Sequence, residues 1–244
     1  MNGIIAFVAV TIVSLISLTG VIFLTISRTI LAQVMSPLLA ISSGVLLGSA
    51  FFDLIPESLK LLPDNALLFM ACGIVAFFTL EKLLQWHHHV EGDHPGEEKP
   101  MAYLSLVGDG IHNFIDGVII GGAFLVSVPL GISVTIAVVA HEIPHELADF
   151  AILIHGGFSN RKALFYNFLS AFTAILGTTL VMGISTVQHS FVPYLISFGA
   201  GNFLYIAMSD LIPELHKPRS KVTSVIQIVA LVIGMTVMYY LPGE

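Results

Sequence analysis

The chain has 244 residues, of which 56% are hydrophobic and only 10% are charged, with a formal net charge of −7. A soluble domain carries roughly 25% charged residues, so this composition leaves too little polar surface for a water-soluble protein with buried helices. We therefore expect a polytopic membrane protein whose first partner is the lipid bilayer, and we expect no nucleic-acid partner.

Runs without Asp, Glu, Lys or Arg define the candidate membrane spans. A spanning helix needs about 20 apolar residues, and turn signals divide the runs into eight segments: 4–26, 37–60, 65–86, 101–126, 130–154, 163–187, 191–214 and 222–241. The first segment lacks the basic n-region and cleavage site of a signal peptide, so we expect it to remain uncleaved as the first membrane span. The predicted fold class is an all-α integral membrane protein with eight transmembrane helices in a single domain, residues 1–244.

Basic residues divide unevenly between the two sides that these spans define. One side holds Lys60 alone, and the other holds Arg28, Lys82, Lys99, Arg161, Lys162, Lys217, Arg219 and Lys221. Lys and Arg favour cytoplasmic connections. The pattern predicts a multi-pass protein of the cell (inner) membrane with both termini on the extracytoplasmic side. Residues 87–100 then form a cytoplasmic loop that contains histidines.

One motif occurs twice, 157 positions apart: Asp-Leu-Ile-Pro-Glu stands at 53–57 and again at 210–214. Aligning 44–60 with 201–217 gives nine identities in 17 positions. Because the second and seventh spans cross in opposite directions, we predict an inverted repeat of spans 1–3 and 6–8 around spans 4 and 5. Many secondary transporters are built this way, with the binding site near the midplane. Asp53 and Asp210 then either line the path or anchor helix ends.

The central spans carry the densest chemistry. His112 with Asp116, and His141 with His145, are spaced i and i+4, so each pair lies on one helical face. Both pairs begin about 16 to 17 Å into their spans, near the middle of a roughly 30 Å hydrocarbon core. Ionisable groups there cost at least about 2.5 to 3.5 kcal/mol each unless they are paired or hydrated. They need a partner, which is either a metal or a hydrogen bond between helices.

Three imidazoles and one carboxylate from two antiparallel helices suit a borderline divalent metal such as zinc, with Fe²⁺, Mn²⁺, Cd²⁺ and Co²⁺ as alternatives. Asn113 and Glu142 point about 100° around their helices from His112 and His141, so they line an adjoining position with more oxygen character. Pro144 removes a backbone donor and frees the carbonyl of Ala140 beside the site.

These motifs resemble those of the ZIP (Zrt/Irt-like) divalent metal transporters over nearly the whole chain. The matching stretches are HNFIDG at 112–117, HEIPHELAD at 141–149, NFLSA at 167–171 and GNFLYIAMSDLIPEL at 201–215. The stretch at 141–149 is most similar to the HExPHExGD pattern of one subfamily, with Ala148 in place of the usual glycine. This departure concerns local helix packing more than metal binding.

The resemblance implies a transporter that moves divalent metal, zinc foremost, into the cytoplasm without ATP, with no catalytic cofactor. The chain also contains no GxxxxGK[ST] run. The implied primary site is His112, Asp116, His141 and His145, and the adjacent position is Asn113 and Glu142. In several relatives a glutamate at the positions of Asp116 and His145 can bridge two metals. The imidazole of His145 cannot bridge through carboxylate oxygens, so the resemblance does not decide whether one or two metals bind at once.

Further polar residues are assigned to the transport path: Asp53, Asp109, Glu146, Asp149, Asn167 and Asp210. A homodimer is compatible with the family. The alternatives are a metal-sensing receptor and an intramembrane zinc metalloprotease, because His141-Glu142-x-x-His145 matches HExxH. Against the protease, Pro144 disturbs the motif's helix, and His112 with Asp116 would fill the position that a catalytic zinc leaves for water. We therefore expect no enzyme.

Overall fold

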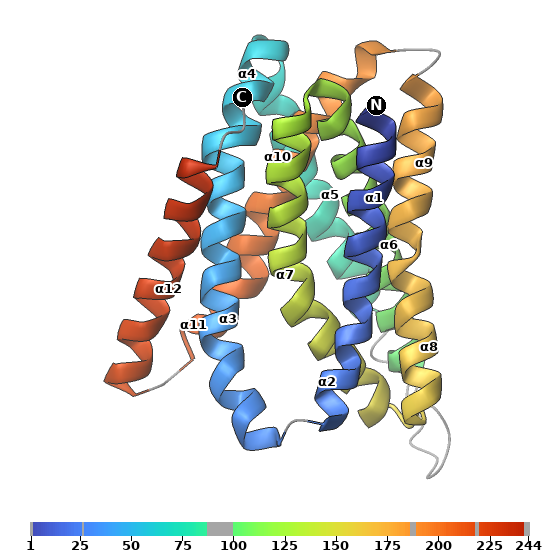
Figure 1. The fold of residues 1–244 in the computed structure, drawn as a ribbon, viewed down its shortest axis with the longest axis vertical. Coiled ribbons are helices and arrows are strands. Elements are labelled where there is room, and N and C mark those ends of the chain that lie inside the picture. Colours follow the sequence, from blue (N-terminus) through green and yellow to red (C-terminus); the bar gives the residue numbers. More distant parts are fainter. Residues whose placement is uncertain (1, 26, 87–99, 186–188, 218–219, 242–244) are drawn as a thin grey trace.

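The computed structural model describes residues 2–25, 27–86, 100–185, 189–217 and 220–241, which form helices joined by short connections. Within these residues, eight helical segments are long and apolar enough to cross a membrane: Asn2–Ile22, Thr29–Leu61, Ala66–Leu83, Ala102–Val126, Val128–His155, Asn160–Ser185, Val192–Leu215 and Lys221–Tyr240. The predicted all-α fold with eight spans is confirmed. Figure 1 shows that the chain begins and ends at the same end of the bundle.

Several spans are built from more than one helical element. The first comprises α1 (Asn2–Ile16), the 3-10 turn η1 (Ser17–Thr19) and α2 (Gly20–Thr25); the second comprises α3 (Arg28–Gly48), the π-helix η2 (Ser49–Leu54) and α4 (Ile55–Leu61). Single helices follow: α5 (Ala66–Trp86), α6 (Pro100–Val126) and α7 (Val128–His155). The sixth span is α8 (Asn160–Ala171) with α9 (Thr173–Ser185). The seventh is η4 (His189–Phe191), α10 (Val192–Tyr205), the π-helix η5 (Ile206–Leu211) and α11 (Ile212–Leu215), and the last is α12 (Lys221–Tyr240).

Polar caps, rather than the first apolar residue, set where the helices begin. The second span was predicted to begin at residue 37, but α3 begins at Arg28, and the side chain of Ser27 accepts a hydrogen bond from the Ile30 amide at 3.3 Å. Pro37 lies inside the helix, since membrane helices tolerate proline where neighbouring groups compensate for the lost bond. The sixth span also begins early, at Asn160, behind the cap of Ser159.

The two copies of the repeated motif have the same local structure. The π-helices η2 and η5 begin at Ser49 and Ile206, which are separated by the same 157 positions as the motifs. Corresponding glycines also make close helix contacts: a Cβ on Gly44 would lie 2.1 Å from the Leu231 carbonyl oxygen, and one on Gly201 would lie 2.0 Å from that of Met70. Thus α3 packs on α12 and α10 packs on α5. The inversion of the two halves stays a prediction.

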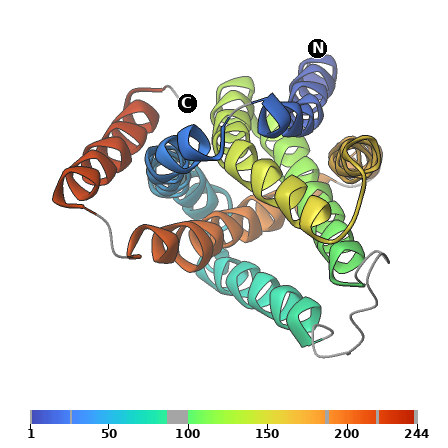
Figure 2. The ribbon, with the colours of Figure 1, turned by 90° about the horizontal axis from the view of Figure 1, so that it is seen from below.

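The spans divide into two groups that meet at the central helices. In Figure 2, α1, α6, α7 and α8 with α9 lie on one side, and α3, α5, α10 and α12 lie on the other. Ser127 joins α6 to α7 and caps α7 by accepting a hydrogen bond from the Leu130 amide at 3.2 Å, so the two helices run antiparallel. Because α7 also packs on α3 and α6 on α10, side chains at their inner faces lie between the two groups.

Candidate metal site

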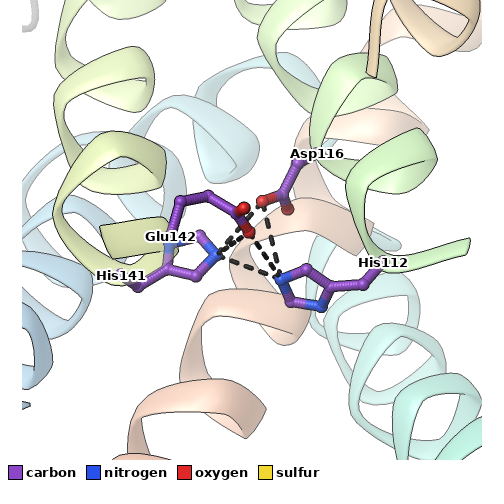
Figure 3. Close-up of side chains that lie close together, drawn as sticks. All are labelled: His112, Asp116, His141 and Glu142. Carbon is purple, nitrogen blue, oxygen red and sulfur yellow. Dashed lines mark hydrogen bonds and ion pairs between the residues drawn. The ribbon is translucent and has the colours of Figure 1, made fainter. Parts of the chain in front are cut away.

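Four side chains from α6 and α7 converge within the bundle, as Figure 3 shows. Each of His112, Asp116, His141 and Glu142 offers one ligand atom, and these atoms lie within 4.8 Å of one another. The closest approaches cross between the helices: His141 Nε2 is 3.1 Å from Asp116 Oδ2, and His112 Nε2 is 3.2 Å from both Glu142 Oε1 and His141 Nε2. We call these four residues the metal cluster.

The metal cluster is buried and has too few hydrogen bonds for its charge. Asp116 and His141 are fully buried and Glu142 is 1% exposed. Both oxygens of Asp116 and Oε1 of Glu142 accept no hydrogen bond. Leaving buried polar atoms unsatisfied is costly, and a bound cation would provide the missing partner. The donor set of two imidazoles and two carboxylates fits a divalent metal of the zinc type.

The ring of His141 is oriented for metal binding. Its Nδ1 lies 3.0 Å from the carbonyl oxygen of Ala137, one turn earlier on α7. Because a carbonyl only accepts, Nδ1 carries the proton, and the lone pair of Nε2 points at the metal cluster. Fixing a ligating imidazole through its other nitrogen is the usual arrangement at metal sites.

His145 and Asn113 lie beside the metal cluster, not in it. The ring of His145 stacks on that of His112, with 5.4 Å between centroids and an interplanar angle of 21°, and its Nε2 is buried without a partner. Asn113 donates to Asp109 Oδ1 at 2.8 Å, and its own side-chain oxygen has no partner. Glu142, predicted for the adjoining position, lies within the metal cluster, and its role as a ligand stays a prediction.

Helix α7 continues through Pro144, which lies inside the predicted span 130–154. The carbonyl oxygen of Ala140, which the proline leaves without an amide donor, lies 2.5 Å from Ser42 Oγ of α3. A serine of the other helix group therefore provides a hydrogen-bond donor to this carbonyl. The contact ties the two groups together one helical position before His141.

Two cavities reach the site from the end of the bundle that carries α11. A cavity of about 300 Å³ touches His112 and His145 and is lined by four carboxylates: Glu81, Asp109, Asp149 and Asp210. A second, of about 410 Å³, touches His145, Asp210 and Glu214. Both therefore meet at the ring of His145. Carboxylates thus line both cavities between His145 and this end of the bundle.

Neutral side chains hold the predicted path carboxylates. Ser105 donates to Asp149 Oδ1 at 2.9 Å, and Ser170 donates to Asp109 Oδ2. Ser105 lies four residues before Asp109 on α6, so helical spacing could have placed it on this face. Ser170 comes from α8, and its spacing from Asp109 in the sequence gives no such signal.

Three other predicted path residues are separate from the cavities. Glu146 and Asn167 are buried, and the Asn167 amide donates to Glu146 Oε2 between α8 and α7. Asp53 is buried toward the opposite end, where Ser133 of α7 donates to it. Sequence reasoning missed Glu81 of α5, which accepts from the Tyr205 hydroxyl at the cavity wall. The signal available was an acidic residue inside a predicted span.

Comparison with known proteins identifies related chains. A family model described as the ZIP zinc transporter matches residues 2–100 and 87–242. The metal cation symporter ZIP14 of Xenopus tropicalis is 31% identical over 284 aligned residues, covering 86% of this chain and 61% of the relative. The ZIP14 of Pongo abelii is 41% identical over 149 residues, covering 58% and 30%. The zinc transporter ZIP10 of Danio rerio is 42% identical over 115 residues, covering 47% and 14%. The chain thus spans less than two thirds of these relatives.

Proposed function

Since the chain belongs to the ZIP family of zinc transporters, we propose that it moves divalent metal cations, zinc foremost, across the membrane through the metal cluster. The single observation that carries this proposal is the convergence of four ligand atoms from two antiparallel helices. At 1.5 Å per residue, His112 and His141 lie about 18 to 20 Å from the starts of α6 and α7, near the midplane of a bilayer.

The proposed direction of transport follows from the side of the metal cluster on which the cavities lie. Asp109, Asp149 and Asp210 line a cavity that reaches His112, while on the other side Asp53 is buried and hydrogen-bonded to Ser133. The open end is the one that carries most of the predicted cytoplasmic basic residues, so transport into the cytoplasm is the favoured direction. Both termini are then extracytoplasmic.

The ligands divide into two sets. The metal cluster provides the primary ligands, and His145, which borders both cavities, receives the metal as it moves toward them; Asn113 remains a candidate for the adjoining position. The two imidazoles favour zinc, and the two carboxylates are also compatible with Mn²⁺, Fe²⁺, Cd²⁺ and Co²⁺. Which of these metals is transported depends on the geometry of the site and the supply of the metal as well as on affinity. The relatives named metal cation symporters support a broad metal range and a coupled ion. Residues 1–244 form a single transmembrane transporter domain of the cell (inner) membrane in this proposal.

The family indicates a transporter rather than an enzyme. The protease alternative requires both imidazoles of His141-Glu142-x-x-His145 on one zinc, whereas His145 lies outside the metal cluster. Glu142 lies 3.2 Å from His112 Nε2, where it would bind metal instead of activating water. These contacts favour transport over proteolysis.

The test is metal uptake into proteoliposomes that contain the purified full chain, without ATP, with a metal-sensitive dye inside. We expect zinc to accumulate faster than in protein-free liposomes, and we expect cadmium, cobalt, iron and manganese to compete. Uptake equal to that of protein-free liposomes, with correctly inserted protein, would contradict the proposal.

A further inference from the structure

An apolar groove of about 570 Å³ lies between α6 and helices α8 and α9, apart from the metal cluster. Its α6 wall runs from Tyr103 to Phe114, a distance of about 16 Å at 1.5 Å per residue. This is about half of a roughly 30 Å hydrocarbon core. Val107, Leu169 and Leu176 line the groove and are exposed, so it faces the lipid and has the length of one leaflet.

One end of the groove is positively charged. Tyr103 and Tyr166 line it there, and the Lys162 ammonium lies 5.9 and 5.7 Å from their ring centroids and 4.8 Å from that of Phe158. Its Nζ is also 3.5 Å from the Tyr103 hydroxyl. Arg161, next to it, is exposed. Cation–π contacts thus hold a lysine at the mouth of an apolar groove, where tyrosines and basic side chains typically meet lipid headgroups.

We propose that this groove binds an anionic phospholipid, with one acyl chain between α6 and α8 and the phosphate at Lys162 and Arg161. The groove is lined by no carboxylate among the described residues, so its wall places no negative charge against a lipid phosphate. Basic residues at a membrane surface attract anionic lipids by about 1 kcal/mol each. The apolar wall adds burial that a soluble phosphate cannot obtain.

The groove lies against a joint that holds a cavity carboxylate. Ser170 lines the groove and donates to Asp109, and Thr173 Oγ1 lies 2.5 Å from the Gly110 carbonyl oxygen. A lipid in the groove would therefore pack against the residues that join α6 to the sixth span. An effect of lipid on transport rests on the proposed function, whereas lipid binding does not.

The test is native mass spectrometry of the purified full chain, titrated with phosphatidylglycerol or phosphatidylcholine of identical acyl chains. We expect phosphatidylglycerol to bind more tightly, and Lys162→Gln to weaken its binding about fivefold without changing that of phosphatidylcholine. Lys162→Arg should retain the preference. Val107→Trp, which fills the groove and leaves the charge, should also weaken binding. The matched controls are Lys221→Gln and Ile228→Trp, at exposed positions of α12.

Four results would overturn the inference. They are equal affinity for the two lipids, unchanged phosphatidylglycerol binding in Lys162→Gln, the same loss in the α12 controls, and displacement of the lipid by millimolar inorganic phosphate. Because Val107→Trp and Lys162→Arg keep the positive charge, a folding defect of Lys162→Gln alone does not decide the outcome. Phosphatidylglycerol binding that is lost in Val107→Trp but kept in Ile228→Trp would support the groove as the binding site. Binding that is kept in Val107→Trp but lost in Ile228→Trp would exclude it.

Discussion

Glu142 of α7 reaches across to within 3.2 Å of His112 Nε2 on α6, while His145 stacks on the His112 ring. We therefore propose different roles for the two side chains: the carboxylate supplies charge to the metal, and the imidazole borders the cavities. A divalent cation held by two imidazoles needs negative charge in a low-dielectric setting. In this proposal, Asp116 and Glu142 together balance its charge.

Exchanging each of these side chains for glutamine separates their roles. We expect Glu142→Gln to lower kcat/KM for zinc uptake by at least about tenfold, since loss of a metal-site partner typically costs 10- to 100-fold. His145→Gln should have the smaller effect, because its ring lies outside the metal cluster. Uptake kinetics in proteoliposomes measure both. A more severe defect in His145→Gln would show that His145, not Glu142, completes the primary set.

Acid should weaken metal binding. His112 and His141 must be neutral to donate a lone pair to a metal. Protons and the metal therefore compete for the same lone pairs, so KM should rise as the pH on the loading side falls, for example from about 7.5 to about 5.5. The measurement is KM with buffered free metal. A KM that stays constant over this range would argue that imidazoles are not the ligands.

The sequence could predict part of this site and not the rest. Helical spacing places His112 with Asp116 on one face, and His141 near the same depth, because these relations depend only on 1.5 Å and 100° per residue. The rotation of α6 against α7, and the reach of a flexible glutamate, depend on packing between helices. Hence no pattern in the sequence predicted the contact of Glu142 with His112. The same holds for the contact of Asp53 with Ser133, which are 80 residues apart.

At the level of elements, the π-helices η2 and η5 carry equivalent aspartates in different surroundings. Asp53 on η2 is buried and hydrogen-bonded, whereas Asp210 on η5 lines both cavities. A π-helix widens the local turn and often marks functional sites. Sequence identity predicted the repeat, but hydrophobic runs could not show that the helix widens there. The predicted start of the second span at residue 37 was also wrong, because α3 begins earlier and continues through Pro37.

Close helix packing at glycine should be sensitive to a single methyl group. A Cβ at Gly201 would lie 2.0 Å from the Met70 carbonyl oxygen, so Gly201→Ala must separate α10 from α5. Overpacking of this kind costs about 1 to 3 kcal/mol, and the melting temperature in detergent should fall. Gly122→Ala is the control, because its Cβ would meet atoms no nearer than 3.7 Å. Equal melting temperatures for both variants would contradict the packing argument.

For the whole molecule, one side of the metal cluster is open and the other is closed. The cavities lie toward α11, and both reach His145. Toward α4, Asp53 is buried against Ser133. A transporter must expose its site to each side in turn, so the structure corresponds to a state open toward the predicted cytoplasmic side.

The histidine-containing loop, residues 87–100, is predicted to lie outside the membrane and outside the transport path; residues 87–99 lie outside the described part of the chain. Deleting His87 to His94 should leave a basal zinc uptake, because the predicted topology places this loop outside the membrane. Proteoliposome uptake by the deletion variant measures this. Complete loss of uptake, with normal insertion and melting temperature, would make the loop an obligatory part of the path.

The central claim is that metal crosses the membrane through the cluster on α6 and α7. The most direct measurement is zinc uptake into proteoliposomes by wild type, His112→Ala and His141→Ala, reconstituted at equal density. We expect both variants to lose nearly all uptake while their insertion is unchanged, since each removes an imidazole that faces the other three ligands. Uptake at the wild-type rate in both variants would contradict the account.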